Sequence, residues 1–104
     1  MEQNLVEFLT KTLDDLKAQD ILAIDVKGKS SITDAMIIAT GTSVRHVAST
    51  ADRLSQEAKQ AGFEVFGDEG KEVSDLIVVD FGQAIVHLLQ ADAREMYQLE
   101  KLWA

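Results

Sequence analysis

Gly41, Thr42 and Ser43 are the residues whose types and spacing best fit a chemical role. They follow an apolar stretch over 36–39, which predicts a buried strand, and they precede a stretch with helical periodicity. Such a strand–turn–helix often holds a phosphate group, because backbone N–H groups and the positive end of the helix dipole converge at the turn. The first question is whether the chain has the catalytic residues of a phosphate enzyme or only the scaffold.

A nucleotide enzyme built on this turn would also need carboxylates that hold a divalent metal. The turn resembles the glycine-serine turn of nucleotidyltransferases, in which acidic residues on a nearby strand provide hard oxygen ligands. The strand predicted over 76–81 carries a single acid, Asp80, and Asp25 of another predicted strand could meet it across a sheet. A nucleotide-binding protein or nucleotidyltransferase-like enzyme is therefore the alternative function. We favour a turn and helix cap without a ligand.

The remaining polar residues form no catalytic or metal-binding pattern. Cysteine is absent, which excludes disulfides, thiolate nucleophiles and cysteine-ligated metals. His46 and His87 have neither the spacing of a metal pair nor that of a nucleophile–base pair. His87 shares a predicted strand face with Ile85 and Leu89, which favours a hydrogen-bonded structural histidine and leaves a partner contact as the alternative. We therefore expect no enzyme activity, no metal and no cofactor.

Length and charge indicate a single acidic domain that acts on a protein partner. A chain of 104 residues fits one domain over 1–104. Its formal net charge of −8 repels the phosphate backbone of nucleic acids and favours encounter with a basic protein surface. The charge also has a simpler interpretation, namely solubility. No apolar run approaches the roughly 20 residues that span a bilayer, and residues 1–4 do not begin a secretory signal. The absence of cysteine fits a reducing cytoplasm.

The apolar periodicities predict a mixed five-stranded sheet with three helices, in the order α-β-β-α-β-β-β-α, which belongs to the α+β or α/β class. The first two strands are expected to pair antiparallel and the last two to form a hairpin, while the crossover through the second helix could make one neighbouring pair parallel. The continuous apolar content of the second strand predicts a central position. The predicted helices cover 4–18, 44–61 and a segment from Asp92, and the predicted strands cover 20–26, 35–40, 63–66, 76–81 and 84–90, with a polar loop over 67–75.

Polar residues and glycines mark the expected helix ends. Thr42 or Ser43 is expected to cap the second helix at its N-terminus, and Gly62 lies where its C-terminal cap belongs. Asp92 and Glu95 have the spacing of a capping box at the start of the third helix.

The strand predicted over 76–81 has two faces with different expected roles. Its odd-numbered residues are all apolar and are expected in the core, because side chains alternate across a strand. Its even-numbered residues, Leu76, Val78 and Asp80, are expected on a shallow surface available to a partner; the simpler alternative is that the whole strand is core. Tyr97 and Trp103 are open to the same two interpretations, as interface anchors or as residues that close a small core.

Several segments of the chain also form an ordered set of family motifs. They are Asp20-Ile21-Leu22-Ala23-Ile24-Asp25-Val26, Ser31-Ile32-Thr33-Asp34, Ala39-Thr40-Gly41-Thr42-Ser43 with Arg45-His46, Glu69-Gly70, Val78-Val79-Asp80, Val86-His87 and the stretch from Arg94 to Trp103. This set resembles the ribosomal silencing factor family, RsfS, also called Iojap-related proteins. The resemblance covers nearly the whole chain, and its motifs are specific as a set rather than singly.

The resemblance implies a bacterial cytoplasmic factor with a nucleotidyltransferase-like fold and no known catalysis. It implies binding to the large ribosomal subunit through ribosomal protein uL-fourteen at the intersubunit face. A factor bound there blocks joining of the small subunit and represses translation when nutrients are scarce, as in stationary phase. Members are often homodimers when free, and no DNA or membrane partner is implied.

The resemblance and the two-faced strand together predict the residues that bind the partner. Leu76, Val78, Asp80 and His87 are expected to form the docking face on two adjacent strands. Many members carry a tryptophan where this chain has Leu76, so a smaller apolar anchor is expected here. The expected border of the face consists of Glu69, Gly70 and Lys71, and Tyr97 is expected to buttress it.

Overall fold

A computed structural model describes residues 4–70, 76–98 and 101 of the chain. Helices and strands follow one another in the order that the sequence predicts. The helices are α1 (Leu5–Asp15), α2 (Val44–Gln60) and α3 (Ala91–Tyr97), and the strands are β1 (Gln19–Asp25), β2 (Ala35–Gly41), β3 (Gly67–Glu69), β4 (Leu76–Asp80) and β5 (Ala84–Gln90).

The five strands form one mixed sheet in the spatial order β1-β2-β5-β4-β3. β1 pairs antiparallel with β2, and β4 pairs antiparallel with both β3 and β5. β2 and β5 are parallel neighbours, from Ala35 opposite Ala84 to Gly41 opposite Gln90, and α2 lies in the connection that such a pair requires. All residues of β2 are buried, which confirms its predicted central position.

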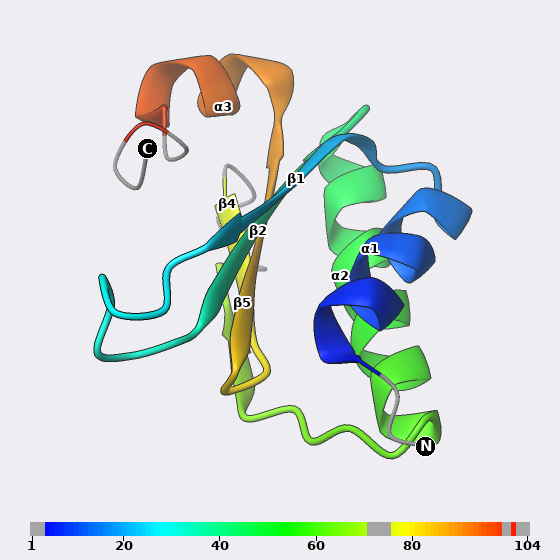
Figure 1. Cartoon of the computed structure of the whole chain (residues 1–104). Helices are drawn as coiled ribbons and strands as arrows, with labels where there is room; N and C mark the ends of the chain where they lie inside the picture. Colours follow the sequence, from blue (N-terminus) through cyan, green and yellow to red (C-terminus); the bar gives the residue numbers. More distant parts are fainter. Residues whose placement is uncertain (1–3, 71–75, 99–100, 102–104) are drawn as a thin grey trace.

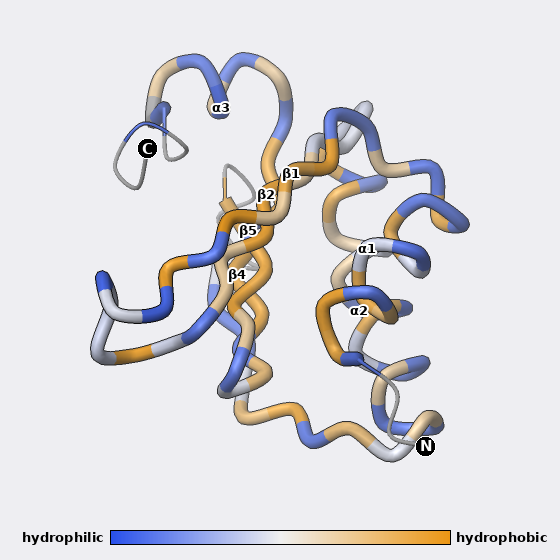
Figure 2. The backbone as a smooth tube through the Cα atoms, viewed as in Figure 1, coloured by the Kyte–Doolittle hydropathy of each residue, from blue (hydrophilic) through white to orange (hydrophobic). Residues whose placement is uncertain are grey.

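α1 and α2 together cover one face of the sheet (Figure 1). Their apolar stripes place Leu9, Leu13, Val47 and Leu54 in a fully buried core against alternate residues of the central strands. Figure 2 shows the corresponding concentration of hydrophobic residues along β2, β4 and β5. The strand residues on this side are Ala35, Ile37, Ala39, Ile77, Val79, Ala84, Val86 and Leu88.

The opposite face carries a second, smaller core. α3 lies at one end of this face in Figure 1, and its Ala93 belongs to a cluster that extends along β2 and also contains Val26, Met36, Ile38 and Leu89. Beyond α3, toward β3, the face consists of half-buried side chains. We call this side of the sheet the outer face; on β4 and β5 its residues are Leu76, Val78, Asp80, Ile85, His87 and Leu89.

The position of the third strand differs from the prediction. The alternation over 63–66 predicts a strand followed by a loop over 67–75, but β3 begins at Gly67. The backbone N–H of Phe66 donates to the oxygen of Asp80 at 2.8 Å, and pairing with β4 continues from Gly67 to Glu69. Backbone hydrogen bonds, rather than apolar side chains, therefore define this edge strand.

The predicted ends of α2 are confirmed, and α3 begins within one residue of the predicted Asp92, but the capping box predicted there does not form. Ser43 is the N-cap of α2, and Gly62 follows its last turn with a φ of 94°. α3 begins at Ala91 after Gln90, whose side chain makes no capping hydrogen bond. Asp92 lies inside the first turn of the helix rather than at its N-cap, so it cannot form the capping box with Glu95.

Candidate partner-binding surface

The pairing of β4 with β5 brings the predicted docking residues together on the outer face. Val78 lies opposite His87, and Leu76 lies opposite Leu89, in the antiparallel register. Asp80 lies on the same face, two residues along β4 from Val78. The even-numbered residues of β4 are half-buried and its odd-numbered residues are fully buried. The structure thus confirms the predicted division of this strand into a core side and an accessible side.

Acidic side chains lie on the β3 side of this face. Glu69 is exposed and pairs with Val78, which places it on the outer face. Asp80 is half-buried, and its Oδ1 atom accepts a hydrogen bond from the N–H of Gly82 at 2.8 Å. The face therefore combines an apolar centre with an acidic margin, which complements an apolar patch flanked by lysine or arginine.

His87 lies in the middle of the face as an uncharged group. Its Nδ1 atom is buried and has no hydrogen-bond partner among the described residues. Burial lowers the pKa of His87 from its ordinary value of 6.5, and a hydrogen bond with the backbone of Ile37 opposes this shift. At neutral pH the imidazole therefore extends the apolar centre and adds no positive charge.

Gly70, at the border of the face, occupies a position that only glycine can fill without strain. Its φ is 96°, and a Cβ atom there would lie 2.1 Å from the backbone oxygen of Leu76. Only glycine lets the chain pass so close to β4. Lys71, the other predicted border residue, lies outside the described residues, and so does the side chain of Tyr97.

At the turn over Gly41–Ser43, which is the alternative site, two backbone donors are occupied by the chain's own side chains. The N–H of Thr42 donates to Nδ1 of His46 at 2.9 Å, and the N–H of His46 donates to Oγ of Ser43 at 3.0 Å. These are donors that a phosphate would use at the start of a helix. The geometry is that of a helix N-cap made by Ser43.

Packing accounts for the glycine of this turn. A Cβ atom at Gly41 would lie 2.5 Å from Cγ2 of Val47, on the first turn of α2. Glycine therefore allows α2 to begin directly against β2, and a ligand is not needed to explain it.

The two aspartates that could have shared a metal lie on different sides of the sheet. Asp25 pairs with Ala35, which belongs to the core under α1 and α2, whereas Asp80 lies on the outer face. β2 and β5 also separate their strands. The possibility that they meet across the sheet is therefore wrong. Within 4–70, 76–98 and 101, no three His, Asp or Glu side chains come together as a metal site.

Arg94 begins the last of the family motifs, but no role was predicted for it from the sequence. Its guanidinium donates from α3 to the backbone oxygen of Asp20 and to Oγ1 of Thr40, the latter at 2.9 Å. Asp20 has a φ of 49°, and the β1–β2 register shifts between Gln19 and Leu22. This irregularity leaves the Asp20 carbonyl free to accept, so Arg94 ties α3 to the ends of β1 and β2 beside the outer face.

Comparison with known proteins relates this arrangement to a family. The whole chain, residues 1–104, matches the family model described as ribosomal silencing factor during starvation, RsfS. The chain belongs to the ribosomal silencing factor family. This confirms the resemblance that the ordered sequence motifs indicated.

Individual relatives support the RsfS assignment. A ribosomal silencing factor RsfS from Haemophilus influenzae is 69% identical over 100 residues, which cover 96% of this chain and 98% of that protein. A mouse protein named mitochondrial assembly of ribosomal large subunit protein 1 is 34% identical over 94% of this chain and 44% of its own length. A crystal structure of a Chromobacterium violaceum protein superposes with a TM-score of 0.90 at 33% identity, covering 97% of this chain and 87% of that one.

The helices that the structure describes do not meet the requirements of a membrane span. None of α1, α2 and α3 is both long enough and apolar enough to cross a bilayer.

Proposed function

We propose that this RsfS-family chain binds the large ribosomal subunit through ribosomal protein uL-fourteen and thereby blocks joining of the small subunit. The family membership supports a role in silencing ribosomes. The outer face is the observation that carries the proposal, because it offers an apolar centre with an acidic margin on the side that α1 and α2 leave uncovered. The factor acts in the cytoplasm by occupying a surface and transforms no substrate.

The chemistry of the face fits a basic protein better than ribosomal RNA. Val78, Ile85 and the uncharged His87 provide apolar area, and Glu69 and Asp80 provide negative charge next to it. The net charge of −8 opposes docking onto phosphates and speeds encounter with a cationic protein surface. A stable contact of this kind buries about 800 Å² on each partner, which one sheet face with its border can supply.

Co-sedimentation with purified subunits tests the binding step. The chain is expected to pellet with large subunits and not with small ones, and to bind isolated uL-fourteen. Light scattering during mixing of the two subunits tests the block, which is expected to grow with the occupancy of the large subunit. Equal binding to both subunits, or undisturbed joining at saturation, would contradict the proposal.

A matched pair of variants tests the surface itself. Val78→Arg places a charge in the centre of the outer face and is expected to abolish subunit binding. Val44→Arg places the same change on an exposed residue at the start of α2, in the other layer, and is expected to bind normally. Leu76→Arg extends the test to the position where many members carry tryptophan. Thermal melts that match the parent chain show that each variant is folded.

The free protein is proposed to form a homodimer, as the family resemblance implies. Light scattering at two concentrations that differ about tenfold separates a dimer that dissociates on dilution from a monomer. A constant monomer mass would remove the dimer from the proposal without affecting subunit binding.

A further inference from the structure

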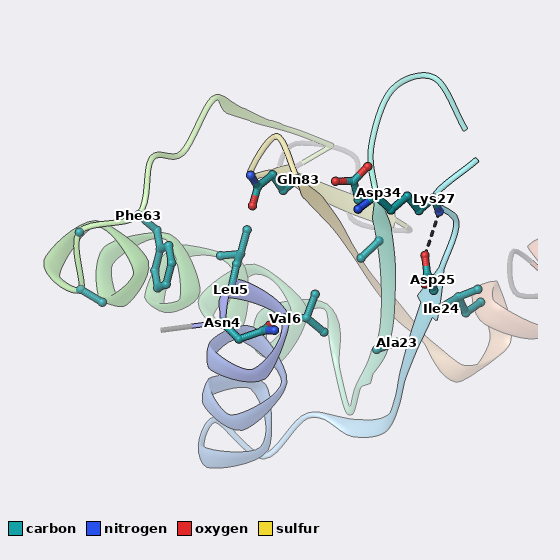
Figure 3. Close-up of a pocket in the computed structure, with 13 residues that line it drawn as sticks. Asn4, Leu5, Val6, Ala23, Ile24, Asp25, Lys27, Asp34, Phe63 and Gln83 are labelled. Atoms are coloured by element: carbon teal, nitrogen blue, oxygen red, sulfur yellow. Dashed lines mark hydrogen bonds between the residues drawn. The ribbon is translucent and has the colours of Figure 1, made fainter. Parts of the chain in front are cut away.

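A groove lies between the helix layer and the β1–β2 end of the sheet. Its volume is about 930 Å³. Figure 3 shows Leu5, Val6 and Phe63 on the helix side, and Asp25 and Asp34 on the strand side. Sites that hold ligands or peptide side chains typically enclose roughly 300–1,000 Å³, so the groove is large enough to take part of a partner.

The helix side of the groove is an apolar wall with fixed geometry. Phe63 packs against Phe8 in a tilted arrangement, with ring centroids 5.1 Å apart and ring planes at 46°, and both rings pack against the main core. A second hollow of about 320 Å³ shares Leu5 and Phe63 with the groove and continues to Phe66. The side chain of Phe66 is 61% exposed. The two hollows therefore form one track from the groove to an exposed aromatic ring, with apolar and polar side chains both lining it.

The charged residues along this track are mostly acidic. Asp25 and Asp34 line the groove together with one base, Lys27, and Glu64 lines the second hollow. The Oδ1 atom of Asp25 accepts from the backbone N–H of Lys27 at 2.9 Å, which fixes that carboxylate at the edge of β1. Three carboxylates against one ammonium give the track a negative potential, which favours a cationic occupant.

We propose that this groove docks a short segment of a partner protein that carries apolar side chains next to a lysine or arginine. The apolar side chains lie against Leu5 and Phe63, and the cation lies beside the carboxylate of Asp34, where it displaces the chain's own Lys27 side chain that Figure 3 shows reaching toward Asp34. The groove is on the α1 and α2 side of the sheet, so this contact is separate from the one proposed for the outer face. The inference stands independently of ribosome binding.

Titration of the isolated, isotope-labelled chain with two short peptides tests the proposal. The probes are acetyl-Leu-Phe-Arg-amide and acetyl-Leu-Phe-Glu-amide, which differ only in the sign of one charge. The arginine peptide is expected to shift the amide signals of Leu5, Ala23 and Phe63 as its concentration is raised into the millimolar range. It is expected to bind about tenfold more tightly than the glutamate peptide, a difference of about 1.4 kcal/mol in binding free energy.

Three variants locate the contact. Asp34→Asn is expected to weaken the arginine peptide about threefold or more while leaving the glutamate peptide unchanged. Asp92→Asn, an exposed acid on α3, is the matched control and is expected to have no effect. Ala23→Arg places a long cation on the exposed strand side of the groove and is expected to remove binding of both peptides.

Three outcomes would overturn the proposal: no shifts at the solubility limit of either peptide, equal affinity for the two peptides, or shifts confined to the outer face. The first would leave the groove as unoccupied surface, and the second would leave a non-selective apolar contact. None of these results bears on subunit binding, which is measured separately.

Discussion

The Nε2 atom of His46 lies 2.9 Å from the backbone oxygen of Leu16, 30 residues earlier in the chain. Because Nδ1 of the same ring accepts from the N–H of Thr42, we assign the ring proton to Nε2, which then donates to Leu16. Leu16 is the C-terminal cap of α1. One neutral imidazole thus joins the end of α1 to the start of α2.

Replacing this histidine is expected to destabilise the fold. His46→Leu leaves the oxygen of Leu16 and the N–H of Thr42 without their protein partner, and we expect a loss of about 1–3 kcal/mol in the free energy of unfolding. Urea unfolding followed by circular dichroism measures the change. Arg45→Ala, at an exposed neighbouring position, is the control and is expected to shift the midpoint little. Equal midpoints for the two variants would show that the bridge contributes nothing.

A methyl group at Gly41 is expected to disrupt the contact between α2 and β2. Its Cβ atom would lie 2.5 Å from Cγ2 of Val47, so Gly41→Ala is expected to cost about 1–3 kcal/mol through overpacking. Gly67→Ala is the matched control, since a Cβ atom there has no neighbour within 4 Å. Val47→Ala combined with Gly41→Ala should recover part of the loss relative to the sum of the single variants, as measured in urea. Additive losses would rule out this clash.

The acidic margin of the outer face is expected to control how quickly the chain finds its partner. Under the proposed function, Glu69→Gln should slow association with large subunits about two- to fivefold at low salt and leave dissociation nearly unchanged. Added salt should reduce the difference, because it screens exposed charges. Stopped-flow mixing at two ionic strengths measures both rates. Asp15→Asn, at the end of α1, is the control, and an equal effect there would mean that only total charge matters.

The lowered pKa of His87 predicts that stability falls in mild acid. The folded chain favours the neutral ring, so below the ordinary value of 6.5 the unfolded state binds a proton that the folded state does not. Stability should therefore decrease as the pH falls below 6.5, until the pH reaches the lower pKa of the folded state. His87→Leu should lack this component. Urea midpoints at pH 7.5 and 5.5 measure it, and the same pH slope in both proteins would assign the effect to other groups.

Sequence periodicity predicted the parts of the fold in which side-chain pattern and burial agree. The alternation over 76–81 gave β4 its two faces, and continuous apolar content gave β2 its central place. The docking residues Val78 and His87 are opposite each other because a short hairpin sets the β4–β5 register. Their proposed role in binding remains a prediction.

The features that the sequence did not predict depend on backbone hydrogen bonds or on contacts between residues far apart in the chain. β3 consists of exposed residues and is defined by hydrogen bonds to β4, so its side chains carry no period-two apolar signal. Arg94 contacts residues 54 and 74 positions away. Its role depends on where α3 meets the sheet, and no local pattern encodes that.

The parallel pairing of β2 with β5 makes completion of the fold a late event in synthesis. β2 ends at Gly41 and β5 begins at Ala84, so residues 42–83, about two-fifths of the chain, must be made between these two strands. Among the strands that the structure describes, β5 alone joins the β1–β2 half of the sheet to the β4–β3 half. A nascent chain that ends before β5 therefore has two separate hairpins and no continuous sheet, and closing so long a loop slows folding.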